Sequence, residues 1–318
     1  MIKIGIMGGS SPIAGELLRL LIHHPDADII WVNSRSMASG AISDVHAGMH
    51  GDTDLRFTPD YNIAAVDMIF LCSTPGETEA FFNENQELPE KLRIVDISGF
   101  GIGHEDFIYG LPELYRKQMV RGGTKVAVPG AIATAIQLAL LPLAKNLMLN
   151  SEIFATGITP QSDRPAMPNF ASAAGNICLD RPLRHPQAEE AASNLATLQS
   201  SYKAPIQLVS MRGPQSRGTM VSLLLDTATD LQHLRELYDS FYDDHSFVCL
   251  IDRPVELKDV VNTNKCIIYL QKFDGRLLVT AAVDNFLKGG AGTAVHSMNL
   301  LFGLAERTGL TIKTSSYF

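Results

Sequence analysis

The segment that decides the fold runs from residue 2 to residue 17 and reads IKIGIMGGSSPIAGEL. Its opening, Ile2 to Ile6, alternates like a β-strand, and the apolar residues after Pro12 recur at helical spacing. The turn between them contains Gly8 and Gly9. In doubly wound α/β domains such a strand, turn and helix bind a dinucleotide pyrophosphate, because glycines admit close approach and the helix N-terminus attracts negative charge.

The glycine fingerprint of this turn is incomplete. A G-x-x-G-x-x-G spacing that starts at Gly8 would place glycine at positions 11 and 14, where the chain has Ser11 and Ala14. We therefore identify Gly8, Ser10 and Ser11 as candidate cofactor-binding residues. The alternative is a tight turn that needs glycine only for its backbone geometry.

The end of the second expected strand, Asp28 to Val32, indicates which dinucleotide is bound. The strand runs into Asn33-Ser34-Arg35-Ser36, where no acidic residue is placed to bind a ribose 2′-hydroxyl. A hydroxyl and a guanidinium suit a 2′-phosphate, so Ser34 and Arg35 predict NADP rather than NAD as the cofactor. The alternative for Arg35 is a surface residue of a polar loop.

The remaining pattern divides the 318 residues into two domains. In the first half, nearly apolar runs alternate with helical patterns, which predicts parallel strands joined by crossover helices. Beyond a long apolar helix that begins at Ala131, alternating strands predict an antiparallel or mixed sheet with helices at about 186–201 and 231–242. We expect residues 1–130 to form an NADP-binding Rossmann domain, completed by the segment 290–318 with a helix at about 291–308, and residues 131–289 to form an α+β domain.

Composition and charge exclude several classes of function. The net charge is -8 and no basic run is present, so we expect no nucleic-acid partner. The N-terminus lacks an export signal, and the longest apolar stretch, 131–144, is interrupted by Gln137 and Pro142, so we expect a cytoplasmic protein without a membrane span. The cysteines lack CxxC spacing, which indicates reduced core or pocket thiols and no metal site. They are Cys72, Cys178, Cys249 and Cys266.

Three further motifs point to a family. The chain from Gly8 to Pro25 carries G-x-x-x-x-x-x-G-E-L-x-R-L-L-x-x-H-P, Tyr109 to Leu114 reads YGLPEL, and Asp284 to Val295 reads DNFLKGGAGTAV. Together they resemble the N-acetyl-γ-glutamyl-phosphate reductases, a family of semialdehyde dehydrogenases, along essentially the whole chain. The resemblance implies a Rossmann domain with an inserted α+β domain, NADP as the cofactor with Asn285 against it, and a homodimer or homotetramer that acts on a small-molecule substrate.

The resemblance also implies a reaction in arginine biosynthesis, in which NADPH reduces an acyl phosphate to a semialdehyde and phosphate is released. In that family a cysteine at the start of a helix attacks the acyl phosphate to form a thioester, and a histidine acts as acid and base. The matching positions are Ala131 and His185, the latter in the place of the second histidine of an H-x-H motif. Arg217 stands where a family arginine meets the substrate.

Ala131 departs from the family at the residue that carries the chemistry. A methyl group cannot attack an acyl phosphate, so the thioester cannot form at this position. The neighbouring positions 128, 132 and 133 differ from the family as well, which a single introduced Cys→Ala change would not explain. The family's arginine after Phe100 and its serine- and glycine-rich substrate loop, which falls near 159–164, are absent too.

Several functions remain compatible with these residues. The first is a reductase of this class, with an introduced alanine or with altered chemistry. The second is a catalytically silent homologue that keeps nucleotide binding. The third is a reductase of another carbonyl substrate that needs no covalent intermediate. For His185, a half-exposed surface histidine is the alternative to an acid/base role. Cys72 ends a parallel strand, where it is either a plain buried thiol or a relocated nucleophile.

Overall fold

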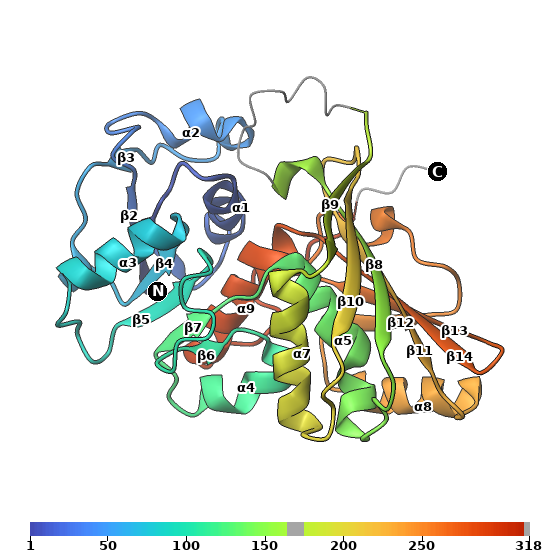
Figure 1. Cartoon of the computed structure of the whole chain (residues 1–318). Coiled ribbons are helices and arrows are strands. Elements are labelled where there is room, and N and C mark those ends of the chain that lie inside the picture. The colour runs from blue at the N-terminus through green and yellow to red at the C-terminus, as the bar shows by residue number, and fades with distance from the viewer. Residues whose placement is uncertain (164–174, 315–318) are drawn as a thin grey trace. The chain divides into compact units, whose positions relative to one another are not determined.

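The computed structural model describes residues 1–163 and 175–314, which form two compact units. Unit 1 comprises Met1–Pro129 and Gly290–Thr311, and unit 2 comprises the rest of the described residues. Each unit is built around its own seven-stranded sheet (Figure 1). None of the helices in the described part of the chain is long and apolar enough to cross a membrane.

The sheet of unit 1 is parallel throughout and has the strand order β3-β2-β1-β4-β5-β7-β6. Its strands are β1 (Ile2–Met7), β2 (Ala27–Asn33), β3 (Phe57–Thr58), β4 (Met68–Leu71), β5 (Arg93–Asp96), β6 (Ile108–Tyr109) and β7 (Lys125–Ala127). Every residue of β4 is buried, as expected for a central strand covered on both faces. The topology confirms the predicted Rossmann-type domain.

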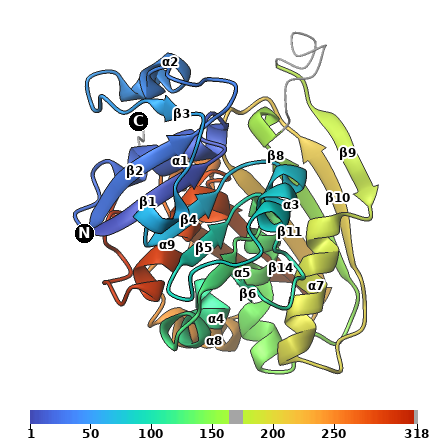
Figure 2. The ribbon, with the colours of Figure 1, turned by 90° about the vertical axis from the view of Figure 1, so that its left-hand side faces the viewer.

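The helices of unit 1 connect and cover these strands. They are α1 (Pro12–Leu21), α2 (Ile42–Val45), α3 (Pro75–Glu84), α4 (Pro112–Val120) and α9 (Gly292–Leu301). Helix α9 comes from the end of the chain and packs against α1, α4 and β5 (Figure 2). It ends at Leu301 and not near residue 308 as predicted, because Gly303 adopts a left-handed φ of 68°, the conformation in which glycine terminates helices.

The sheet of unit 2 has the order β12-β13-β14-β11-β8-β10-β9. Its strands are β8 (Ile153–Thr159), β9 (Cys178–Leu183), β10 (Ile206–Arg212), β11 (Thr219–Asp226), β12 (Val248–Ile251), β13 (Cys266–Phe273) and β14 (Arg276–Val283). The pairs β8–β10 and β12–β13 are parallel and the others are antiparallel, so the sheet is mixed. The alternation of apolar residues in the sequence could not distinguish a mixed sheet from an antiparallel one.

Three helices lie on one face of this sheet: α5 (Ala131–Lys145), α7 (Pro186–Leu198) and α8 (Leu231–Tyr242) (Figure 1). Helix α5 is buried from Ala131 to Ala144, which accounts for its nearly continuous apolar sequence. It packs against α7 and against β11, β13 and β14. A short π-helix, Leu287–Ala291, leads from β14 back to unit 1.

Candidate functional site

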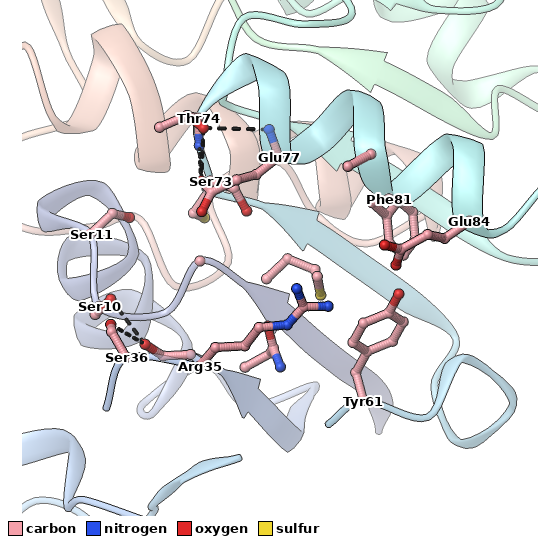
Figure 3. Close-up of a pocket in the computed structure, with 16 residues that line it drawn as sticks. Ser10, Ser11, Arg35, Ser36, Tyr61, Ser73, Thr74, Glu77, Phe81 and Glu84 are labelled. Carbon is pink, nitrogen blue, oxygen red and sulfur yellow. Dashed lines mark hydrogen bonds between the residues drawn. The ribbon is translucent and has the colours of Figure 1, made fainter. Parts of the chain in front are cut away.

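A cavity of about 470 Å³ opens at the carboxyl ends of β1, β2 and β4 in unit 1 (Figure 3). The strand order reverses between β1 and β4, and doubly wound sheets bind ligands at this point. Five residues that the sequence predicted to bind the cofactor line this one cavity. They are Gly8, Ser10, Ser11, Ser34 and Arg35.

The turn after β1 forms a close backbone cradle in spite of its incomplete fingerprint. Gly8 has a φ of 68°, and a Cβ there would lie 2.6 Å from the backbone nitrogen of Ser73, so only glycine fits. Ser11 instead has extended backbone, and its hydroxyl caps α1 by accepting from Ala14 N at 3.3 Å. Position 11 therefore needs no glycine. The narrow turn and the start of α1 suit a pyrophosphate.

Hydroxyl groups and one guanidinium form the β2 side of the cavity. The Ser34 hydroxyl donates to Ser10 Oγ at 3.1 Å and lies 3.3 Å from Ser36 Oγ. Arg35 is exposed and extends into the cavity, as Figure 3 shows. It has no hydrogen bond or ion pair with any residue that the structure describes, so its donors are available to an anionic ligand.

Helix α3 supplies the opposite wall, which sequence reasoning missed. Thr74 and Glu77 form a capping box: Thr74 Oγ1 accepts from Glu77 N at 3.4 Å, and Glu77 Oε2 accepts from Thr74 N and Oγ1 at 2.9 and 2.8 Å. These hydrogen bonds, with a smaller contribution from the charge of Arg35, hold the pKa of Glu77 below its ordinary value. The T-x-x-E spacing directly after a buried strand was the signal for this helix start.

The family's nucleophile position lies at the beginning of α5, in unit 2. Ala131 is the first residue of the helix and is 7% exposed, so its predicted place in a first helical turn is confirmed. The backbone N–H groups of Ile132 and Ala133 both donate to Gln187 Oε1, at 3.0 and 3.1 Å. Two of the donors that this helix end would offer to an anion are therefore occupied by a side chain from α7.

His185 lies at the start of the same helix α7. Its Nδ1 accepts from Gln187 N at 3.2 Å, which makes it the N-cap of α7. The alternative of a half-exposed surface histidine was wrong: the residue is 8% exposed, because its ring turns back to cap the helix. Gln187 thus contacts His185 through its backbone N–H and the start of α5 through its side chain, so one residue links the family's histidine and cysteine positions.

Arg217 and Asn285 meet at another place in unit 2. Arg217 donates through Nε and Nη2 to the two oxygens of buried Asp284, at 3.1 and 3.0 Å, and its guanidinium lies 5.1 Å from the ring centre of Phe286. Asn285 Oδ1 accepts from Gly218 N at 2.9 Å. A substrate-binding Arg217 and a cofactor-binding Asn285 stay predictions.

The cysteines differ in their surroundings. Cys72 is 2% exposed, and burial, with the nearby charge of Asp96, raises the pKa of its thiol far above the usual range. A thiol that stays protonated is a poor nucleophile, which favours the plain buried thiol. Cys266 is buried too, but Cys178 and Cys249 are exposed, contrary to expectation, because β9 and β12 are the edge strands of their sheet.

Family models match most of the chain. Residues 3–121 match the semialdehyde dehydrogenase NAD binding domain, and residues 132–285 match the semialdehyde dehydrogenase dimerisation domain. Among solved structures, aspartate semialdehyde dehydrogenase II from Vibrio cholerae is 13% identical with a TM-score of 0.76, over 95% of this chain and 99% of that one. Aspartate semialdehyde dehydrogenase with NADP from Candida albicans is 14% identical with a TM-score of 0.71, over 95% and 98%. At these identities the likeness shows the fold alone.

Curated relatives are much closer in sequence. The proteins named N-acetyl-γ-glutamyl-phosphate reductase from Parabacteroides distasonis and Phocaeicola vulgatus are 45% and 43% identical to this chain, over 100% of each chain in both comparisons. The namesake from Bacteroides thetaiotaomicron is 42% identical over the same extent. Full-length similarity at this level, together with the two matched domains, shows that the chain belongs to the N-acetyl-γ-glutamyl-phosphate reductase family of semialdehyde dehydrogenases.

Proposed function

We propose that this chain is an NADP(H)-dependent oxidoreductase of the N-acetyl-γ-glutamyl-phosphate reductase type, which acts on a small acyl phosphate or its semialdehyde without a cysteine thioester. The cavity of unit 1 carries the proposal, because it unites the glycine cradle, the start of α1 and an available Arg35 at the switch point of the sheet. The names of the full-length relatives support the reaction class and a place in arginine biosynthesis.

The residues of the cavity fit NADP(H). The backbone at Gly8 and the N-terminus of α1 would hold the pyrophosphate, and Ser34 and Arg35 would bind the 2′-phosphate. The matched NAD binding domain supports a nicotinamide dinucleotide, and the NADP of the Candida albicans structure supports the phosphorylated form. When bound, the cofactor would supply or accept a hydride.

The residues of unit 2 limit the chemistry available to the substrate. Ala131 excludes a covalent intermediate at the family's position. His185 accepts the Gln187 N–H at Nδ1, so in its neutral form the ring proton is on Nε2. Nε2 is then the atom that would donate a proton to a substrate oxygen.

A second candidate function is a catalytically silent homologue that retains nucleotide binding. One observation favours it: Gln187 Oε1 already accepts from the N–H groups of Ile132 and Ala133, which occupies two of the donors that the start of α5 could offer to a substrate oxygen. For either function we infer a cytoplasmic homodimer or homotetramer. The match of residues 132–285 to a dimerisation domain supports the assembly.

Two measurements on the purified protein test these proposals. Fluorescence titration with NADPH and NADH measures binding, and the absorbance of reduced cofactor measures turnover of N-acetylglutamate semialdehyde with phosphate and NADP. Binding with turnover supports the reductase, and binding without turnover supports the silent homologue. If neither cofactor binds, both proposals are wrong. Alkylation of the exposed Cys178 and Cys249 is the control, because a thiol-free route survives it.

A further inference from the structure

The face of α3 that borders the dinucleotide cavity carries two carboxylates. Glu77, Ala80, Phe81 and Glu84 recur at helical spacing, and all of them line the cavity (Figure 3). Among the described residues of this lining, Arg35 is the one cation. The cavity proposed to hold a phosphorylated dinucleotide is therefore lined by one guanidinium and two carboxylates.

Glu77 is held in place at the first turn of α3. Its Oε2 accepts from both the N–H and the hydroxyl of Thr74, at 2.9 and 2.8 Å, so the carboxylate cannot swing away without breaking the capping box. Its charge also interacts with that of Arg35, which lies across the cavity. A phosphate that binds Arg35 would meet this fixed negative charge.

We propose that Glu77 is a specificity-determining residue of the cavity, whose fixed negative charge opposes the 2′-phosphate of NADP and limits the preference for NADP over NAD. The inference rests on the proposed binding of NADP(H) in this cavity. NADP differs from NAD only by the 2′-phosphate. Arg35 attracts that group and Glu77 repels it. The pyrophosphate is the same in both cofactors, so its interaction with these two charges does not account for a difference between their affinities.

The substitution Glu77→Gln tests this role with little structural change. Glutamine has nearly the same shape and replaces glutamate in capping boxes, so α3 keeps its N-terminus while the charge is removed. Glu79→Gln is the matched control, because Glu79 is on the same helix, is exposed and does not line the cavity. Fluorescence titrations give the Kd of NADPH and of NADH for the wild type and both variants.

We expect Glu77→Gln to tighten NADPH binding by about three- to tenfold at low ionic strength. This is the effect expected when one unit charge that repels a bound phosphate is removed. NADH binding should stay within about twofold, and the gain for NADPH should shrink at about 0.2 M salt because ions screen exposed charges. Glu79→Gln should have a smaller effect on NADPH. Thermal unfolding of both variants checks that the fold is retained.

Each contrary result has a distinct meaning. An unchanged ratio of NADPH to NADH affinity in Glu77→Gln, or an equal gain for both cofactors, overturns the role of Glu77 while cofactor binding itself stands. An equal effect of Glu79→Gln shows that only the overall charge matters and overturns it too. If the wild type binds neither cofactor, the proposed function fails and this inference fails with it.

Discussion

At position 131 the first residue of α5 is an alanine, and a side chain from α7 accepts from the backbone donors beside it. A cysteine at the first residue of a helix is activated because the helix N-terminus favours the thiolate. Here the N–H groups of Ile132 and Ala133 instead donate to Gln187 Oε1. The nucleophile is therefore absent from this helix start, and two of the backbone donors beside it are occupied.

This arrangement predicts that Ala131→Cys alone will not restore phosphate-dependent semialdehyde dehydrogenase activity. The new thiol would compete with Gln187 for the donors, and one missing oxyanion donor costs about 10²–10³ in rate. The assay follows reduced cofactor with N-acetylglutamate semialdehyde, phosphate and NADP, and Ala131→Ser is the matched control. Turnover of about 1 s⁻¹ or more in Ala131→Cys would show that the rest of a working reductase site is intact.

A second prediction for a single residue concerns Arg35 and cofactor binding. Arg35→Gln should weaken NADPH binding by about ten- to a hundredfold, the range for loss of a hydrogen bond to a charged group, and should leave NADH binding nearly unchanged. Titration of both cofactors measures this. Arg56→Gln removes the same charge outside the cavity and serves as the control. Equal losses for the two cofactors would contradict a contact with the 2′-phosphate.

The residues of the candidate site differ in how far their positions could be predicted from the sequence. Gly8, Ser34 and Arg35 directly follow parallel strands, whose carboxyl ends meet at one edge, so their gathering could be predicted. Gln187 could not be predicted, because its contact with α5 joins residues 55 and 54 positions apart. Glu77 was recognisable only as part of a helix start, and its place opposite Arg35 depends on the packing of α3.

Among the helices, α5 shows how packing tolerates a residue that should disrupt it. Pro142 lies inside the helix and has no N–H to donate to the carbonyl of Leu138, four residues earlier. The buried hydroxyl of Tyr242, on α8, donates to this same carbonyl. The hydroxyl of Tyr238 donates to the next carbonyl, that of Ala139, at 2.5 Å. Helix α8 therefore satisfies an acceptor that Pro142 leaves open.

We accordingly expect Tyr242→Phe to lower the free energy of unfolding by about 1–3 kcal/mol, the cost of an unsatisfied buried acceptor. Urea unfolding measures it, and Tyr269→Phe, on the partly exposed face of β13, is the control. Adding Pro142→Ala should relieve part of the loss, since alanine restores the missing N–H. If Tyr242→Phe is equally costly in the Pro142→Ala variant and in the wild type, the hydroxyl does not compensate for the proline.

The segment after α9 is held by a contact that depends on pH. Glu306 Oε2 lies 2.7 Å from His296 Nε2, and Glu306 Oε1 lies 3.4 Å from Arg116 Nε. The hydrogen bond to His296 holds the pKa of Glu306 below its ordinary value of 4.5, against the opposing effect of burial. A lowered pKa in the folded state stabilises the fold above pH 4.5, and this contribution is lost as the pH falls through the lowered value.

Glu306→Gln should therefore be less stable than the wild type at pH 7, and the difference should narrow as the pH falls below about 4.5. Urea unfolding at pH 7 and at successively lower pH values measures both proteins. Glu79→Gln, on an exposed position of α3, controls for the loss of one carboxylate. A difference that stays constant over this range would contradict the proposed stabilisation by the ionised form.

Elements whose sequences carry a strong apolar pattern were predicted. Strands that are defined mainly by their pairing with a neighbouring strand were not. The apolar run from Ala131 indicated a buried helix, and the structure has one. The edge strands β9 and β12 were not predicted, because short edge strands carry little periodic signal. The end of α9 was misplaced because the sequence offers two glycines, Gly303 and Gly309, and both adopt a positive φ. Only the first of them follows the helix directly.

For the whole molecule, we propose that the outer face of the unit 2 sheet forms the interface between copies of the chain. Helices α5, α7 and α8 cover the other face (Figure 1). On the outer face Phe154 of β8 pairs with Leu224 of β11, and Leu224 pairs with Leu278 of β14, so the three apolar side chains form a row. Phe154 is 53% exposed. Such a row, within a matched dimerisation domain, suits burial against a second copy of the chain.

Phe154→Lys should therefore reduce the mass of the particle in solution to that of a smaller assembly, because in a two-fold interface each substitution introduces a charge on both partners. Sedimentation equilibrium measures the mass. Val120→Lys is the control, since Val120 is 56% exposed on α4 of unit 1. The fold should survive in both variants, as neither side chain is in a core, and circular dichroism checks this. An unchanged mass for Phe154→Lys beside a reduced mass for Val120→Lys would place the interface on unit 1 instead. Retention of the full mass by both variants would show that the sheet face does not hold the assembly together.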